Sequence, residues 1–174
     1  EVAVKNGFVE VNSNYQTNIS SIYAIGDVID TPMLAHVASR EGELAVEHML
    51  GKEIEKIDNL SVPSVVYAEP QIASFGYSEE RLKEKEIPYE KAVHQYRANG
   101  KAVAVGEVEG LVKVFVHQET KKLLGVHIVG KQATEIIHEL LLAKNADMKL
   151  EDIINVVHAH PTFSELLREA VLSF

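Results

Sequence analysis

Short apolar runs separated by turn residues make up the first thirty positions of the chain. In AVKNGFVEV, apolar residues alternate on both sides of Asn6-Gly7, which predicts a β-hairpin with a two-residue turn. The later run SIYAIGDV predicts a short buried strand that ends at Gly26-Asp27. We therefore expect the chain to open with β-structure.

An amphipathic segment, DTPMLAHVASREGELAVEHMLGK, comes next and predicts a helix from about Met33. Thr31 is the expected cap, Pro32 suits the first helical position, and Gly51 suits the end of the helix. The residues expected to share one face of this helix are Leu34, Val37, Ala38, Ala45 and Met49.

The polar, proline-terminated stretch KEIEKIDNLSVP interrupts this periodicity. Such a stretch is typical of a connection between compact lobes, because it offers few apolar side chains for a core. We therefore expect a first domain over residues 1–51, a linker over residues 52–61 and a second domain over residues 62–174.

Short strand-like runs dominate the first half of this second domain. Two of them flank Glu69-Pro70, and three more are KAVAVGE, LVKVFVH and LLGVHIVG. The polar QETKK between the last two predicts a hairpin. SEERLKEKEI predicts a short helix that begins after Ser78 and stops before Pro88.

Two amphipathic helices are expected to complete the domain. Their apolar faces are Ala133, Ile136, Ile137, Leu140 and Leu141 in the first, and Phe163, Leu166, Leu167, Ala170, Val171 and Phe174 in the second. An antiparallel sheet of three to four strands, covered by helices on one side, would bury both faces. The fold class is therefore α+β.

Composition narrows the possible partners and compartments. The chain has 174 residues and a net charge of −9, which argues against nucleic acid because a phosphate backbone needs a basic surface. It has no cysteine, which excludes a disulfide scaffold and a cysteine nucleophile within this chain. No apolar run approaches the roughly 18 residues of a membrane span, and no signal-peptide pattern is present. We expect no membrane span and a cytoplasmic location. Because the sequence begins at Glu1 within a strand-like run, we also expect a piece of a longer protein.

Gly26-Asp27 is the first candidate for chemistry. A strand ending there would place a carboxylate at the carboxyl edge of a sheet, where it could accept hydrogen bonds from ribose or ribityl hydroxyls. The start of the next helix would suit an anion or an electron-rich ring. These residues alone favour the simpler interpretation, a turn followed by a capped helix.

Eight histidines raise the question of a metal site. HELLLA at His138 begins like a zinc-protease helix, but no second histidine follows four residues later. His158 and His160 could meet one metal ion, but no neighbouring cysteine or carboxylate cluster completes a set of ligands. We therefore expect no metal.

The stretch HAHPTFSELLREA supports two interpretations. Thr162 and Glu165 have the spacing of a capping box, in which the hydroxyl caps the helix and the acid reaches back to the cap amide. Alternatively, His160 is a general acid or base whose ring Glu165 orients, and the following prolyl bond, if cis, fixes its direction. Spacing alone favours the helix cap.

The same stretch closely resembles the C-terminal signature of the dihydrolipoamide dehydrogenases, a family of flavin-dependent pyridine nucleotide-disulfide oxidoreductases. Other stretches resemble further parts of that family in the same order, and together they span nearly the whole chain. They are TNISSIYAIGDV, TPMLAHVASREG, VPSVVYAEPQIASFGYSEERL and LLGVHIVGKQATEIIHELLLA. The resemblance implies that residues 1–51 are the remnant of an α/β FAD-binding domain, and that residues 62–174 are the dimerisation domain.

The resemblance also assigns roles to residues. Gly26-Asp27 would belong to the FAD site, with Asp27 on the ribityl chain. Main-chain groups would approach the flavin ring at Met33, Leu34, Ala35 and His36. His160 would be the acid–base residue of dithiol exchange and Glu165 its partner, and both would act in the active site of the other subunit of a homodimer.

Some parts that the family needs are missing from this chain. It has no GxGxxG and no cysteine pair, and we expect these and the NAD-binding domain to precede Glu1. The parent would oxidise dihydrolipoamide on the dihydrolipoyl domain of a 2-oxo-acid dehydrogenase complex, through a disulfide and FAD to NAD. The chain alone is expected to be inactive and to bind FAD poorly. The alternatives are a glutathione or mercuric type of reductase, and a non-catalytic interaction domain with the same fold.

Overall fold

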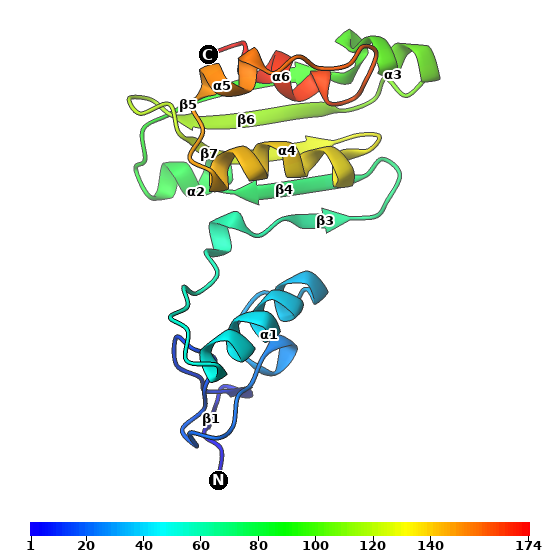
Figure 1. Cartoon of the computed structure of the whole chain (residues 1–174). Coiled ribbons are helices and arrows are strands. Elements are labelled where there is room, and N and C mark those ends of the chain that lie inside the picture. The colour runs from blue at the N-terminus through cyan, green and yellow to red at the C-terminus, as the bar shows by residue number, and fades with distance from the viewer. The chain divides into compact units, whose positions relative to one another are not determined.

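The computed structural model describes all 174 residues, which form two compact units, Glu1–Asn59 and Leu60–Phe174 (Figure 1). The boundary between the units lies within residues 52–61. No helix of either unit has the length and apolar character needed to cross a membrane.

The first unit begins with the predicted hairpin. Strands β1 (Val4–Lys5) and β2 (Phe8–Val9) are antiparallel. The turn residues Asn6 and Gly7 both have positive φ, 51° and 87°, as the favoured two-residue hairpin turn requires. The hairpin prediction is therefore confirmed.

The prediction of a strand over SIYAIGDV is wrong. The run makes only an isolated bridge between Gln16 and Tyr23, and it ends in the 3₁₀ helix η1 (Gly26–Val28). Ile22 and Ile25, expected inside, are 40% and 37% exposed. A strand needs a neighbouring strand for its backbone groups, and this unit provides none along the rest of the run.

Helix α1 (Ala35–Met49) is present, but it begins later than predicted. Thr31 does not cap it, and Pro32 lies outside it, because hydrogen bonds from Thr31 N–H to Ile29 and from Leu34 N–H to Pro32 keep this segment in tight turns. Leu34 occupies the cap position without a side-chain cap bond. Gly51, with φ of 78°, ends the helix as predicted.

The buried face of α1 also differs in part from the prediction. Val37 and Ala45 are buried as expected, whereas Met49 is exposed. The helix buries Val37, Glu41, Leu44 and Ala45. The core of this unit is small, with Tyr15, Ile29, Leu44 and Ala45 at its centre.

The second unit is built on one antiparallel sheet with the order β3-β4-β7-β6-β5 (Figure 1). It therefore has five strands rather than the three to four predicted. The strands are β3 (Ser64–Val66), β4 (Ile72–Gly76), β5 (Tyr89–Gln95), β6 (Leu111–His117) and β7 (Leu123–Val129). The hairpin between β6 and β7 and the strands on both sides of Glu69-Pro70 are confirmed.

The predicted strand KAVAVGE is wrong, because these residues form helix α3 (Gly100–Val105). Asn99 caps the helix by accepting the N–H of Ala102 at 2.9 Å, and Gly106 ends it in the left-handed conformation. An alternation of small apolar and polar residues predicts strand and short helix equally well, and here the flanking cap and glycine decide. The two edge strands of the sheet are β3 and β5. The short 3₁₀ helix η2 (Asn59–Ser61) precedes β3, and η3 (Tyr96–Ala98) follows β5.

Three helices lie over one face of this sheet, as Figure 1 shows. They are α4 (Ala133–Asn145), α5 (Leu150–Asn155) and α6 (Glu165–Val171). Helix α4 packs on β4 and β7, and α6 packs on β5 and β6. The predicted apolar faces are confirmed, since all their residues are buried except Phe163 and Phe174, which are partly buried against the same core. The α+β class is confirmed.

Helix α2 (Glu79–Glu84) begins after Ser78, whose Oγ accepts the N–H of Arg81, as predicted. Its Glu79 carboxylate contacts Tyr89 and Lys91 of β5, whose side chains alternate with the core-facing Ala92. Helix α2 therefore lies against the other face of the sheet. The prediction that helices cover only one side of the sheet is wrong.

Candidate active site at the last helix

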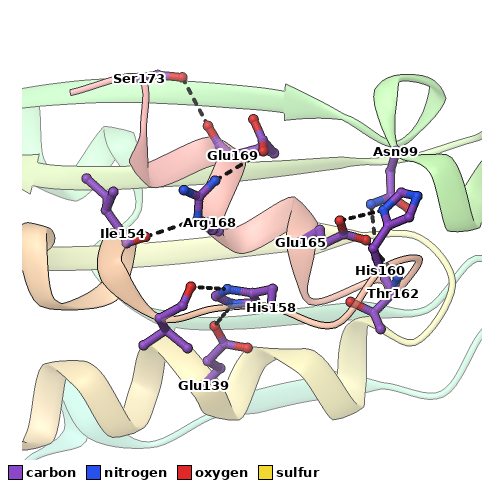
Figure 2. A network of polar contacts seen from close by, with 11 residues as sticks. Asn99, Glu139, Ile154, His158, His160, Thr162, Glu165, Arg168, Glu169 and Ser173 are labelled. Carbon is purple, nitrogen blue, oxygen red and sulfur yellow. Dashed lines mark hydrogen bonds and ion pairs between the residues drawn. The ribbon is translucent and has the colours of Figure 1, made fainter.

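The loop before α6 brings His160 and Glu165 together, as Figure 2 shows. His160 Nδ1 lies 2.9 Å from Glu165 Oε1, and the other carboxylate oxygen, Oε2, accepts the backbone N–H of Thr162 at 2.7 Å. The peptide bond that follows His160 is cis. Each oxygen of Glu165 thus has its own donor, which fixes the plane of the carboxylate.

This geometry determines which ring nitrogen of His160 is available. The carboxylate accepts, so Nδ1 carries the hydrogen, and in the neutral ring Nε2 keeps a free lone pair. The His160 side chain is 74% exposed, so Nε2 can reach a substrate. The Thr162 amide, and after it His160, lower the pKa of Glu165, so that the carboxylate is ionised at neutral pH and can stabilise an imidazolium. The pair has the arrangement of a general base and its orienting acid.

The capping box is only half present. Glu165 does reach back to the Thr162 amide, but the Thr162 hydroxyl donates to the carbonyl of Ala159 at 2.8 Å instead of capping the helix. Ser164 occupies the cap position and makes no side-chain cap bond. Because α6 begins at Glu165 itself, this acid is the first helical residue, and its second oxygen is free to hold His160.

The start of α3 forms a wall beside His160. The buried side chain of Asn99 donates to the carbonyl of Thr162 at 3.0 Å while its oxygen caps α3. A Cβ on Gly100 would lie 3.3 Å from Cε1 of the His160 ring. Sequence analysis missed this wall because it assigned the segment to a strand, although Asn99-Gly100 and Gly106 are the usual signals for a capped short helix.

His158 lies apart from His160 and pairs with a different acid. Its Nε2 is 2.7 Å from Oε1 of Glu139 on α4, and its Nδ1 is 3.0 Å from the carbonyl of Val156 (Figure 2). Its side chain is 6% exposed. The exposed His138 contacts only the carbonyl of Glu135 in its own helix. The fold does not bring three or more potential metal-ligating side chains of His, Cys, Asp or Glu together anywhere in the chain.

The six candidates for cofactor binding lie together in the first unit, over residues 26–36. Helix η1 packs on α1, so that the exposed Asp27 lies near the start of α1. Met33 is exposed, Leu34 is the cap residue of α1, and Ala35 and His36 form its first turn. The amides of a first helical turn have no acceptors within the helix, so they can face a negatively charged or electron-rich group.

Glu41 is a residue of this region that sequence analysis missed. Its side chain is almost fully buried, with the residue 1% exposed, and Oε2 accepts the N–H of Gly26 at 2.7 Å. Gly26 has φ of 68°, and a Cβ there would lie 3.1 Å from Cβ of Ala38. Glu41 therefore fixes the turn that presents Asp27. An acid on the apolar face of α1, next to Val37 and Ala45 in helical spacing, was the available signal.

Comparisons with known proteins identify the family. The model of the pyridine nucleotide-disulphide oxidoreductase dimerisation domain matches residues 62–171, and that of pyridine nucleotide-disulphide oxidoreductase matches residues 1–42. A mitochondrial dihydrolipoyl dehydrogenase of Pisum sativum is 46% identical over 169 residues, which are 97% of this chain and 34% of that protein. Leghemoglobin reductase of Glycine max is also 46% identical over 169 residues, which are 97% of this chain and 32% of that protein.

Solved structures show the same fold. LpdA of Mycobacterium tuberculosis superposes with a TM-score of 0.93 at 24% identity, over 99% of this chain and 38% of that one. The flavoprotein disulfide reductase RclA of Escherichia coli gives 0.91 at 21% identity, over 98% of this chain and 40% of that one. The chain spans about a third of the length of the curated relatives it matches. It belongs to the pyridine nucleotide-disulphide oxidoreductases and contains their dimerisation domain.

Proposed function

We propose that this chain is the C-terminal part of a dihydrolipoyl dehydrogenase, in which His160 and Glu165 form the acid–base pair of dithiol–disulfide exchange. The observation that supports this most directly is that the two carboxylate oxygens of Glu165 have different hydrogen-bond partners. One oxygen is held by the Thr162 amide and the other holds Nδ1 of His160, so that Nε2 is exposed and unprotonated in the neutral ring.

In the proposed reaction, Nε2 of His160 takes the proton of a dihydrolipoamide thiol. The resulting thiolate attacks a disulfide supplied from outside these residues, one S–S bond forms as another breaks, and the leaving sulfur departs as a thiolate. This exchange leaves a mixed disulfide between substrate and enzyme. The second thiol of the substrate then attacks the substrate sulfur of that mixed disulfide, which closes the lipoamide disulfide and releases the second enzyme sulfur as a thiolate, so that the dithiol is oxidised and the enzyme disulfide is reduced. Glu165 stabilises the imidazolium until His160 returns the proton.

The proposed assembly is a homodimer. The matched domain is a dimerisation domain, which supports an assembly of two copies. We place His160 and Glu165 in the active site of the partner subunit, with the dihydrolipoyl domain of a 2-oxo-acid dehydrogenase complex as the source of the dithiol.

The residues over 26–36 fit one edge of a flavin cofactor. Glu41 and the lack of space for a Cβ at Gly26 fix a turn that presents the exposed Asp27 carboxylate, which suits ribityl hydroxyls. The first-turn amides of Ala35 and His36 suit the flavin ring. Bound FAD would pass electrons between the disulfide and a nicotinamide cofactor. In this proposal Gly26, Asp27 and the residues from Met33 to His36 would hold the FAD. We assign none of the residues of this chain to NAD binding.

A second substrate class has one observation in its favour. Leghemoglobin reductase is as similar to this chain as the dihydrolipoyl dehydrogenases are, so the same fold and identity occur in a protein named for a different electron acceptor. A glutathione type of reductase is the other alternative. Steady-state rates with dihydrolipoamide, with leghemoglobin and with oxidised glutathione would distinguish these substrate classes.

The test of the proposal is His160→Gln in the full-length protein to which we assign this chain. Glutamine keeps the polar volume but cannot take the proton, so we expect turnover with dihydrolipoamide to fall by about 10²–10⁴-fold. Sedimentation should show the dimer unchanged. Unchanged turnover in an intact dimer would overturn the proposal. The 174-residue chain by itself should show neither flavin absorbance nor dihydrolipoamide-dependent NAD reduction.

A further inference from the structure

The segment between α5 and α6 carries His160 but has no regular secondary structure of its own. Phe163, next to α6, packs against the core, but the apolar residues nearer α5 do not anchor the segment, since Val156 is half-exposed and Val157 is almost fully exposed. Side-chain hydrogen bonds hold the segment instead, as Figure 2 shows for the contacts of Arg168 and Glu139. Arg168 Nε donates to the carbonyl of Ile154 at 3.0 Å, and Thr162 Oγ1 donates to that of Ala159 at 2.8 Å.

The His158–Glu139 contact lies between these two anchors. Nε2 of His158 is 2.7 Å from Glu139 Oε1, a short separation for a nitrogen and an oxygen. Glu139 comes from α4, which packs on β4 and β7, so that the contact ties the segment to a helix of the core. It is two residues from His160.

Hydrogen-bond chemistry sets the number of protons in this contact. The Val156 carbonyl can only accept, so Nδ1 of His158 carries a hydrogen. A neutral ring would then turn the lone pair of Nε2 toward the Glu139 carboxylate, and two acceptors repel each other. The observed geometry therefore needs one additional proton, shared between Nε2 and the carboxylate.

Other charged groups face the same ring from α6. His158 shares a surface hollow of about 350 Å³ with the charged residues Glu165, Arg168 and Glu169. Arg168 contacts Glu169, with Nη1 to Oε1 at 3.5 Å, and its Nε is engaged at Ile154. Glu139 is the only acid in direct contact with the ring of His158.

We propose that His158 and Glu139 are a positioning pair, whose shared proton fixes residues 156–160 and thereby the direction of His160. The expected effect of this pair on catalysis rests on the proposed function, whereas its effect on the position of the segment does not. Loss of this hydrogen bond would release the segment from α4. The position of His160 then depends on Glu139, which does not contact it.

Two substitutions at Glu139 separate the role of its hydrogen bond to His158 from the role of the shared proton. Glu139→Gln can donate from its amide to Nε2 of a neutral ring, so it keeps the bond without the additional proton. Glu139→Leu has a similar volume and no polar atom, so it breaks the bond at every pH. Glu135→Gln, at an exposed site on the same helix, is the matched control.

The measurement is amide hydrogen exchange of Thr162 in the 174-residue chain, followed by NMR at one fixed pH. Because Thr162 N–H is bonded to Glu165, its protection reports whether the His160 site is assembled. We expect exchange about 10–100-fold faster in Glu139→Leu, the cost of one charge-assisted hydrogen bond. Glu139→Gln should stay protected, and Glu135→Gln should match the unmodified chain.

Equal Thr162 protection in all four proteins would overturn the proposal, as would a loss of protection in Glu139→Gln as large as that in Glu139→Leu. Turnover of the full-length variants tests the two proposals separately. If Glu139→Leu releases Thr162 while His160→Gln keeps its activity, the positioning pair stands and the proposed function fails. If His160→Gln is inactive and Glu139→Leu leaves protection and turnover unchanged, the reverse holds.

Discussion

His158 and His160 lie two positions apart in the loop before α6, and each pairs with a glutamate of a neighbouring helix. The two pairs differ in which ring nitrogens remain free. In the His160–Glu165 pair the ring is 74% exposed and only Nδ1 is bonded. In the His158–Glu139 pair the ring is 6% exposed and both nitrogens face acceptors. A carboxylate beside a histidine is common to both.

The comparison shows that the free nitrogen, rather than the acid, marks a candidate acid–base residue. The second oxygen of Glu165 is bonded to the Thr162 amide, so that this acid orients the ring without enclosing it. Glu139 and the Val156 carbonyl instead occupy both nitrogens of His158. The first arrangement can exchange protons with a substrate, and the second can hold a loop in place.

We expect the two pairs to differ most in how turnover responds when the charge of the acid is removed. Glu165→Gln removes the charge that stabilises an imidazolium at His160, so we expect turnover of the full-length protein to fall by about 10²-fold or more. Glu139→Gln keeps its hydrogen bond and should leave turnover near that of the unmodified protein. Steady-state kinetics with dihydrolipoamide would check this, and equal losses in both variants would remove the distinction.

Asn99→Ala should weaken the His160 side of the loop selectively. The buried amide caps α3 and holds the Thr162 carbonyl, so its removal leaves buried polar groups unpaired and should cost about 1–3 kcal/mol of unfolding free energy. Urea titration followed through the amide signals of β6 would measure this loss. Asn155→Ala, exposed at the end of α5, is the control and should be nearly neutral. A neutral Asn99→Ala would show that α3 does not support the site.

A smaller and more local change is expected from Gly100→Ala. The new Cβ would lie 3.3 Å from Cε1 of His160, so the ring must move by a few tenths of an ångström, while stability should change by less than about 1 kcal/mol. The ring signals of His160 should shift in NMR spectra and those of His158 should not. Lys101→Ala serves as control. Shifts of equal size at both rings would contradict the local contact.

The pH dependence of stability should show the smallest effect. The pKa of Glu165 is lowered by the Thr162 amide and by His160, so its carboxylate contributes stability above its unfolded pKa of 4.5, and this contribution is lost as pH falls through the lower folded value. Glu165→Gln should therefore flatten the acid limb of the stability curve. Urea midpoints between neutral and acid pH would measure it. An unchanged acid limb would mean that the carboxylate gains nothing from its contacts.

Local chemistry made much of the fold predictable. The Asn6-Gly7 turn, the Ser78 cap and the apolar spacing over residues 133–145 each act within a few residues, and each formed as predicted. The errors at SIYAIGDV and KAVAVGE have different causes. SIYAIGDV did not become a strand because no distant strand is available to pair with it, and short windows of sequence do not contain that information. At KAVAVGE the deciding signals are local, the Asn99 cap and Gly106, and the prediction overlooked them.

The same limit applies to the candidate site. Spacing made a contact between His160 and Glu165 foreseeable, because five residues across a helix start bring them into reach. Glu139 lies 19 residues before His158, and Asn99 lies 63 residues before Thr162, so only the packing of α4 and α3 reveals these contacts. Sequence therefore identified the exposed pair as a candidate and missed what holds it in place.

The most direct test of the central claim is the tautomer of His160 in the 174-residue chain, measured by long-range ¹H–¹⁵N NMR of the ring. If Glu165 holds Nδ1–H, the neutral ring should show a protonated Nδ1 and an unprotonated Nε2, and Glu165→Gln should weaken that preference. A neutral His160 with its hydrogen on Nε2, or a tautomer that does not change in Glu165→Gln, would contradict it.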